Sequence, residues 1–202
     1  GAEKQSSIEK EKFLEALTNV TSQVSEGQIQ TLTTLLDYVC IDAEKDKKFN
    51  ISADELTELL KLAAENNNPD VIDALFSASH DKNGDRKAVS ASALNAEQLY
   101  QAIEISAEAG NSRTLPTLLS KIPTPKTGDD GKVKYDAENG KIIFAKGEEA
   151  KAQYAKLLNK SLKHVSKHGG QEFSVKAIIE RSFTKDKDGV ATSKSVISPE
   201  NL

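Results

Sequence analysis

Residues 54–78 read as two amphipathic helices that face each other across a short polar turn. In the first half, apolar residues recur with the spacing of one helical face, at Leu56, Leu59, Leu60 and Ala63. Three asparagines and Pro69 then end this helix, because Asn tolerates the left-handed conformation at a helix C-terminus and Pro suits the first turn of the next helix. The second half has its own apolar face, formed by Val71, Ile72, Leu75 and Phe76. The stretch therefore predicts an antiparallel helical hairpin.

The same hairpin pattern occurs four times along the chain. Each copy has a turn residue, an apolar residue five positions later, and an apolar pair eight and nine positions later. The copies are Gly27 with Leu32, Leu35 and Leu36; Asn67 with Ile72, Leu75 and Phe76; Gly110 with Leu115, Leu118 and Leu119; and Gly170 with Val175, Ile178 and Ile179. In the two middle copies, small residues precede the turn at Ala63, Ala64, Ser106 and Ala107. Regular inner copies between less regular outer copies are typical of a stacked array with capping ends.

These copies predict a mainly α fold with one helical-repeat domain over residues 9–183. Its stacked antiparallel hairpins are expected at about 9–40, 53–78, 95–122 and 148–183. The turn residues lie 40, 43 and 60 positions apart, and the longest spacing contains two short β-prone runs, at 132–135 and 141–144. A segment ending in Asn139 and Gly140 separates the runs, so we expect one inserted β-hairpin at about 130–146. Residues 184–202 lack periodicity and are expected to be a tail or an incomplete repeat.

Two helix starts carry capping signals. Ser52 is followed three residues later by Glu55, and Asn95 is followed three residues later by Gln98. In a capping box, the first side chain accepts from the backbone of the third helical residue, whose own side chain reaches back. We therefore expect the first helices of the second and third hairpins to begin at these two residues.

Two segments resemble the helix–turn–helix part of ankyrin repeats: residues 61–78, KLAAENNNPDVIDALFSA, and residues 104–122, EISAEAGNSRTLPTLLSKI. In that family, paired small residues let the two helices approach and a terminal leucine pair closes the core. HDKNGDRKAV and TKDKDGVATS, at residues 80–89 and 184–193, are similar to the Asp/Asn/Gly-rich turns that link ankyrin repeats. The Thr-Pro-Leu-His start of the family is missing, with only His164 at the position of its His, and the spacing exceeds the usual 33 or so residues. The resemblance implies an ankyrin-like α-solenoid; a generic α-hairpin solenoid and a single irregular helical domain stay open.

Charge and hydropathy exclude several classes of protein. The net charge is −4, and acidic and basic residues are interspersed, which argues against a nucleic-acid partner or an anionic membrane surface. No apolar run approaches the roughly 20 residues that span a bilayer, so membrane insertion is not expected. These features favour a soluble, cytoplasmic protein. The chain starts at Gly1 without a Met, which leaves a removed targeting segment, secretion or delivery into another cell open.

Neither catalytic nor metal-binding motifs are found in the sequence. Phosphate loops, nucleophile elbows and zinc-protease motifs are absent, and the single Cys40 is read as a core residue. Asp81, Asn83 and Asp85 alternate as in a calcium loop, but Arg86 and Ser92 occupy the positions where that loop needs Gly and an acid. His164 and His168 have helical spacing without an identifiable third ligand. We therefore predict no cofactor, no metal and no catalytic residue.

The sequence favours a non-catalytic module that binds a partner protein through its repeat loops and the faces of its first helices. The residues predicted to contact the partner are Lys61, Glu65, Asp81, Asn83, Asp85, Arg86, Glu104 and Glu108. The alternative is part of an enzyme, toxin or effector whose active site lies in the 123–147 insertion or outside this sequence. A deep cleft with convergent titratable groups would distinguish the enzyme from the binding module.

Overall fold

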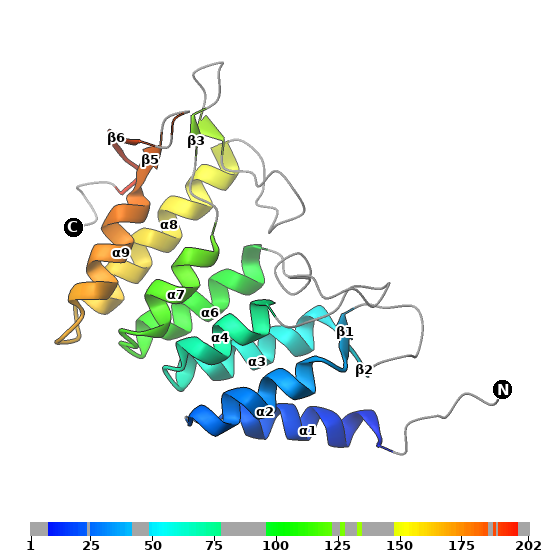
Figure 1. Ribbon diagram of the computed structural model, residues 1–202. Helices are drawn as coiled ribbons and strands as arrows, with labels where there is room; N and C mark the ends of the chain where they lie inside the picture. Colours follow the sequence, from blue (N-terminus) through cyan, green and yellow to red (C-terminus); the bar gives the residue numbers. More distant parts are fainter. Residues whose placement is uncertain are drawn as a thin grey trace.

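A computed structural model describes the protein at residues 8–23, 25–41, 49–77, 96–122, 126–127, 133–134, 148–185, 188 and 190–197. This part of the chain is mainly helical, as predicted, and contains eight helices (Figure 1). They are α1 (Lys10–Thr21), α2 (Glu26–Leu36), α3 (Ala53–Glu65), α4 (Pro69–Ser77), α6 (Ala96–Glu108), α7 (Thr114–Lys121), α8 (Glu148–Val165) and α9 (Glu172–Ser182).

The helices form two layers (Figure 1). Each of the helices α1, α3, α6 and α8 packs against the helix that follows it in the chain, and these four first helices lie side by side in chain order. The second helices α2, α4, α7 and α9 lie side by side in the same order. Each predicted hairpin range therefore holds one helix of each layer.

The core between the layers includes most of the residues that the repeat pattern marked. The small residues Ala63, Ala64, Ser106 and Ala107 are all fully buried, at 0% exposure. At least one member of each apolar pair is buried, and the buried members are Leu36, Leu75, Phe76, Leu118, Leu119 and Ile178. The other two members, Leu35 and Ile179, are half-buried and pack against the core. The repeat pattern thus marks buried residues at six of these eight positions.

The start of α3 has the predicted capping box. Ser52 Oγ accepts from the Glu55 amide at 3.1 Å, and Glu55 Oε2 accepts from the Ser52 amide at 2.7 Å. Lys10 of α1 adds an ion pair to Glu55 at 3.0 Å. Burial acts to raise the pKa of Glu55, but the Ser52 and Lys10 hydrogen bonds and the Lys10 charge outweigh it, so the pKa lies below its ordinary value. The predicted cap at Asn95 lies outside the described residues.

Three of the four predicted turn residues have the left-handed backbone. The φ angles are 51° at Asn67, 66° at Gly110 and 71° at Gly170. The prediction was wrong for Gly27, which lies in the first turn of α2. There the chain reverses earlier, because Ser25 already has the extended conformation of an N-cap, with φ −144° and ψ 151°.

The residue after each left-handed turn residue joins its hairpin to the preceding one. Asn68 Nδ2 donates to the Gln23 carbonyl at 3.3 Å, and Gln171 Nε2 donates to the Gly110 carbonyl at 2.7 Å. Asn111 Nδ2 donates to the carbonyls of Ala64 and Glu65, at 2.6 and 3.1 Å. We call Asn68, Asn111 and Gln171 the turn amides. They satisfy carbonyls near the C-terminal ends of the preceding first helices, which have no partner within their own helix.

Asn67 also links two hairpins. Its Oδ1 accepts from the backbone amides of Arg113 and Thr114, both at 3.1 Å. These amides stand at the start of α7, where a helix leaves its N–H groups without internal partners. A side chain of the second hairpin thus caps a helix of the third.

Short strands lie at the ends of the hairpins. β1 (Val39–Ile41) pairs in parallel with β2 (Phe49–Ile51). β3 (Lys126–Thr127), β4 (Val133–Lys134), β5 (Phe183–Lys185) and β6 (Ala191–Ser195) have the spatial order β4-β3-β5-β6. The first hairpin was expected to be helical to Cys40, but α2 ends at Leu36 and β1 follows. β-Branched residues at both ends of β1 favour this extended conformation.

The insertion and the tail are described in part. β4 falls in the first predicted β-prone run but pairs antiparallel with β3, whereas residues 141–144 and the Asn139 turn lie outside the described residues. Residues 184–202, expected to be a tail or an incomplete repeat, contribute most of β5 and all of β6. This segment is held by a hydrogen bond from the Val196 amide to the Ser182 carbonyl at 2.8 Å, and Ile197 is buried at 7% exposure.

Three glycines in the turns separate the effect of backbone conformation from that of steric contact. We expect Gly169→Ala to change the free energy of unfolding by no more than about 0.5 kcal/mol, because nothing lies within 4 Å of an added Cβ. Gly170→Ala should cost about 1–2 kcal/mol, because Gly170 has equally open surroundings but a φ of 71°. Gly110→Ala should cost more than Gly170→Ala, since its added Cβ would also lie 2.6 Å from Cγ of His168. Urea unfolding measures this order, and equal costs at Gly110 and Gly170 would contradict the contact with His168.

Candidate functional site

The exposed side of the first helices carries four rows of polar residues. Each row has the spacing i, i+4, i+7, i+11, which is one face of a helix. The rows are Glu11, Glu15, Thr18 and Ser22 with α1; Asp54, Glu58, Lys61 and Glu65 on α3; Glu97, Gln101, Glu104 and Glu108 on α6; and Lys156, Lys160, Lys163 and Lys167 with α8. Ser22 and Lys167 lie just beyond the ends of their helices. All sixteen side chains are exposed or half-buried, and together we call them the first-helix ridge.

The buried side of each helix fixes the correspondence between the rows. In every row, the residue directly before the third ridge position is an apolar core residue. These core residues are Leu17, Leu60, Ile103 and Leu162, with exposures of 0, 0, 0 and 8%. The rows therefore occupy equivalent positions in four parallel helices.

The ridge changes sign along the stack. The formal charge of the rows is −2 with α1, −2 on α3, −3 on α6 and +4 with α8. Neighbouring rows adjoin, as the hydrogen bond from Gln98 Nε2 of α6 to Asp54 Oδ1 of α3 shows, at 2.9 Å. The boundary between the acidic and basic parts lies between α6 and α8.

Ion pairs cross this boundary near Lys160. Its Nζ lies 2.7 Å from Glu104 Oε2 and 3.9 Å from Glu108 Oε1, and His164 Nε2 lies 3.6 Å from the same Glu108 oxygen. The hydrogen bond that Lys160 donates to Glu104, together with the negative charges of Glu104 and Glu108, raises the pKa of Lys160 in spite of some desolvation. Lys156, Lys163 and Lys167 make no ion pair with any residue that the structure describes.

Half of the residues predicted to bind a partner lie on the ridge. Glu65 is exposed, and Lys61 is half-buried and pairs with Glu58 at 2.7 Å. Glu104 and Glu108, also predicted to contact the partner, make ion pairs with Lys160 and His164 of α8. The other four, Asp81, Asn83, Asp85 and Arg86, lie outside the described residues.

The lysine row with α8 was not among the residues predicted from the sequence. Apolar and uncharged polar residues separate these lysines along the chain, so they do not form a continuous block of like charge. A signal was present, because each lysine follows its α6 counterpart by the same 59 positions. Aligning the third and fourth copies by their cores would have found the row.

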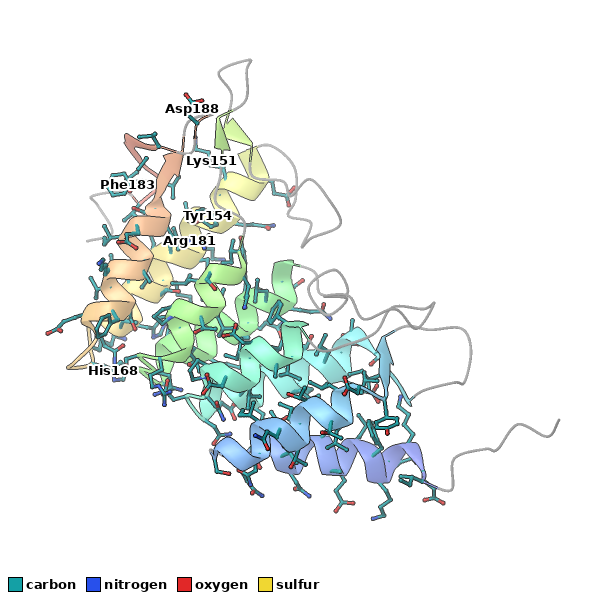
Figure 2. All side chains as sticks on the ribbon, viewed as in Figure 1. Lys151, Tyr154, His168, Arg181, Phe183 and Asp188 are labelled. Carbon is teal, nitrogen blue, oxygen red and sulfur yellow. The ribbon has the colours of Figure 1, made fainter. Side chains whose placement is uncertain are left out.

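The described residues contain neither a cluster of metal ligands nor a membrane-spanning helix. Within those ranges, no group of three or more His, Cys, Asp or Glu side chains is placed to hold a metal ion. His168 lies at the turn end of the stack (Figure 2), with Nε2 3.0 Å from the Glu108 carbonyl. No helix in those ranges has the length and apolar character needed to cross a membrane.

Open cavities lie between helices in the part of the chain that the structure describes. One of about 610 Å³ lies between α7, α9 and the strands β5 and β6, and most of its lining is apolar, as at Pro116, Leu119 and Phe183. Another, of about 400 Å³, lies between α6 and α8, and it is lined by Glu97, Tyr100, Gln101, Glu104, Gln153, Lys156 and Leu157. The second cavity therefore opens at the boundary where the ridge changes sign.

Buried polar groups near these cavities hold the last hairpin together. Tyr154 and Arg181 lie on the facing helices α8 and α9 (Figure 2), and the Tyr154 hydroxyl donates to the Arg181 carbonyl at 2.8 Å. The Arg181 guanidinium donates to the Ile122 carbonyl at the end of α7. Burial lowers the pKa of Arg181 and raises the pKa of Tyr100. Tyr154 and Arg181 therefore have structural hydrogen bonds. The 123–147 insertion, in which the enzyme alternative places an active site, is described only at β3 and β4.

Comparison of the chain with protein-family models, with curated protein sequences and with solved structures gave no match. The function is therefore argued from the residues of this chain.

Proposed function

We propose that the protein is a non-catalytic module that binds a partner protein through the first-helix ridge and the loops that link its hairpins. In this proposal the hairpins form an ankyrin-like α-solenoid, an elongated stack whose side surface is available to a partner. The observation that carries the proposal is the ridge itself, with sixteen exposed or half-buried polar residues at equivalent positions of four parallel helices.

A rigid scaffold supports binding by such a surface. The turn amides join each hairpin to the one before it, and the buried residues Ala64 and Ala107 let neighbouring helices approach closely. Side chains held on rigid elements lose less conformational entropy when a partner binds, so more of their interaction energy remains as affinity. The ridge residues are therefore preorganised by the core beneath them.

The charge pattern supports recognition of a specific partner. An acidic area across α1, α3 and α6 adjoins a basic row with α8. Complementary charges on a partner raise the rate of association and fix the orientation of the complex, and like charges reject wrong partners. A ridge that carries both positive and negative charge fixes the orientation of a bound partner better than a surface with charge of one sign.

Site-specific photo-crosslinking tests the proposal. A benzophenone amino acid replaces Glu65 on the ridge in one variant and Thr34, an exposed residue of the second-helix layer, in the control. After irradiation in lysate of the cells that produce the protein, we expect a defined protein adduct from the Glu65 variant and none from the Thr34 variant. Adducts formed only from Thr34, or equally from both positions, would overturn the ridge as the binding surface.

A further inference from the structure

Resting on the proposed function, we infer that the α8 end of the ridge takes an acidic segment of the partner, with carboxylates at helical spacing. The site is the row Lys156, Lys160, Lys163 and Lys167, called here the lysine row. With a rise of 1.5 Å per residue, the row is about 16 Å long, or about three turns of a partner helix.

The lysine row is not neutralised by the rest of the chain. Among the described residues, Lys160 alone of the four has acidic partners, Glu104 and Glu108. The other three present their charge to solvent, and all are exposed. Like charges three and four residues apart destabilise a helix, so an anionic ligand along the row would relieve a repulsion that the free protein carries.

The helix dipole does not explain the row. Cations are favourable within the last turn of a helix, which accounts for Lys163 and at most for Lys167 just beyond it. Lys156 lies in the middle of α8, where the dipole has little effect. Lys156 instead lines the cavity of about 400 Å³ beside α6, together with Leu157 and Gln153. A partner side chain can enter this hollow next to the basic row.

The acidic row on α6 favours an acidic protein segment over a nucleic acid as the ligand of the lysine row. Glu97, Glu104 and Glu108 lie on α6 beside the lysine row, and Lys160 contacts two of them. Double-stranded nucleic acid carries one negative charge per about 1.7 Å over its whole surface, so it would meet these carboxylates as well. A protein segment can be acidic on one side and neutral or basic on the other. The single row of lysines beside a row of carboxylates therefore fits an acidic protein segment.

Fluorescence anisotropy with two labelled peptides tests the inference. Both are alanine-rich peptides of about 18 residues, or about five helical turns, with equal numbers of Glu. In peptide A the Glu residues follow the i, i+4, i+7, i+11 spacing, and in peptide B they are distributed around the helix. We expect the protein to bind peptide A about tenfold more tightly than peptide B, because only peptide A can pair several lysines at once.

Two double variants with the same net charge locate the binding site. The variant with Lys163→Glu and Lys167→Glu should bind peptide A about tenfold or more weakly than the unchanged protein. The variant with Lys12→Glu and Lys176→Glu should lose less than about twofold in affinity. Lys12 and Lys176 are exposed and lie off the ridge. Circular dichroism melting checks that each variant folds. If the variant with Glu at positions 163 and 167 does not fold, Lys163→Gln with Lys167→Gln takes its place, and its affinity for peptide A should also fall.

Several results would overturn the inference. Equal affinity for peptides A and B, or an equal loss of affinity for peptide A in both double variants, would show that binding depends only on net charge. If a single-stranded oligonucleotide binds more tightly than peptide A, and the substitutions at Lys163 and Lys167 weaken its binding equally, the ligand is a nucleic acid. A salt-sensitive dimer in sedimentation that peptide A dissociates would make the occupant a second copy, with its own acidic rows. If peptide A does not bind but crosslinking at Glu65 still captures a partner, this inference fails and the proposed function stands. If peptide A binds the lysine row but crosslinking at Glu65 captures no partner, the proposed function fails instead.

Discussion

Leu118→Ala should lower the free energy of unfolding by about 2–5 kcal/mol. Leu118 is fully buried, at 0% exposure, in α7, which packs against the helices α4, α6 and α9. Removal of its side chain leaves a cavity where the third hairpin meets its neighbours, and helices held on several sides cannot collapse into that space. Urea unfolding followed by circular dichroism measures the loss.

A matched change on the surface serves as the control. Phe173→Ala removes a larger apolar side chain, but Phe173 is 74% exposed, so the free energy of unfolding should change by less than about 0.5 kcal/mol. If Leu118→Ala were as mild as this control, the stacking of the second helices around α7 would be wrong.

Ala107→Leu should destabilise the protein by about 1–3 kcal/mol through overpacking. Ala107 is fully buried at 0% exposure near the end of α6, which packs against α3, α7 and α8. A leucine there needs three additional heavy atoms' worth of space, so the helices must separate or the side chain must leave its preferred rotamer. A fall in melting temperature relative to the unchanged protein measures the effect.

Ala109→Leu makes the same chemical change two residues later. Ala109 is exposed, so the added atoms extend into solvent and the melting temperature should stay nearly constant. An unchanged melting temperature for Ala107→Leu would show that the neighbouring helices leave room at this position, contrary to the close approach described for α6.

Local signals in the sequence predicted most of the helices. The apolar periodicity predicted the four hairpins whose helices make up the two layers. The capping box of Ser52 and Glu55 and the left-handed Asn67 also occur as predicted. These features depend on neighbouring residues, so a single sequence contains them. Gly27 misled the prediction because a glycine is also tolerated in the first turn of a helix, and only the extended Ser25 shows where the chain reverses.

Features that join distant parts of the chain were not predictable in this way. The hydrogen bonds of the turn amides join residues between 45 and 61 positions apart, and the pairing of β3 with β5 also depends on the folded arrangement. An asparagine after a turn residue gives no indication of which carbonyl it will reach. Glu104 was predicted from the sequence as a partner contact, but its ion pair with Lys160 follows only from the packing of α6 against α8.

The turn amides give the stack a direction. Each donor, at Asn68, Asn111 or Gln171, finds its acceptor in the hairpin that precedes it in the chain. The hydrogen bonds that the Arg113 and Thr114 amides donate have the same order, since their acceptor, the Asn67 side chain, also comes first in the chain. A ribosome synthesises the chain from its N-terminus, so every acceptor emerges before its donor. Each new hairpin can therefore dock on a completed template, and the order of translation is also the order in which the stack can grow.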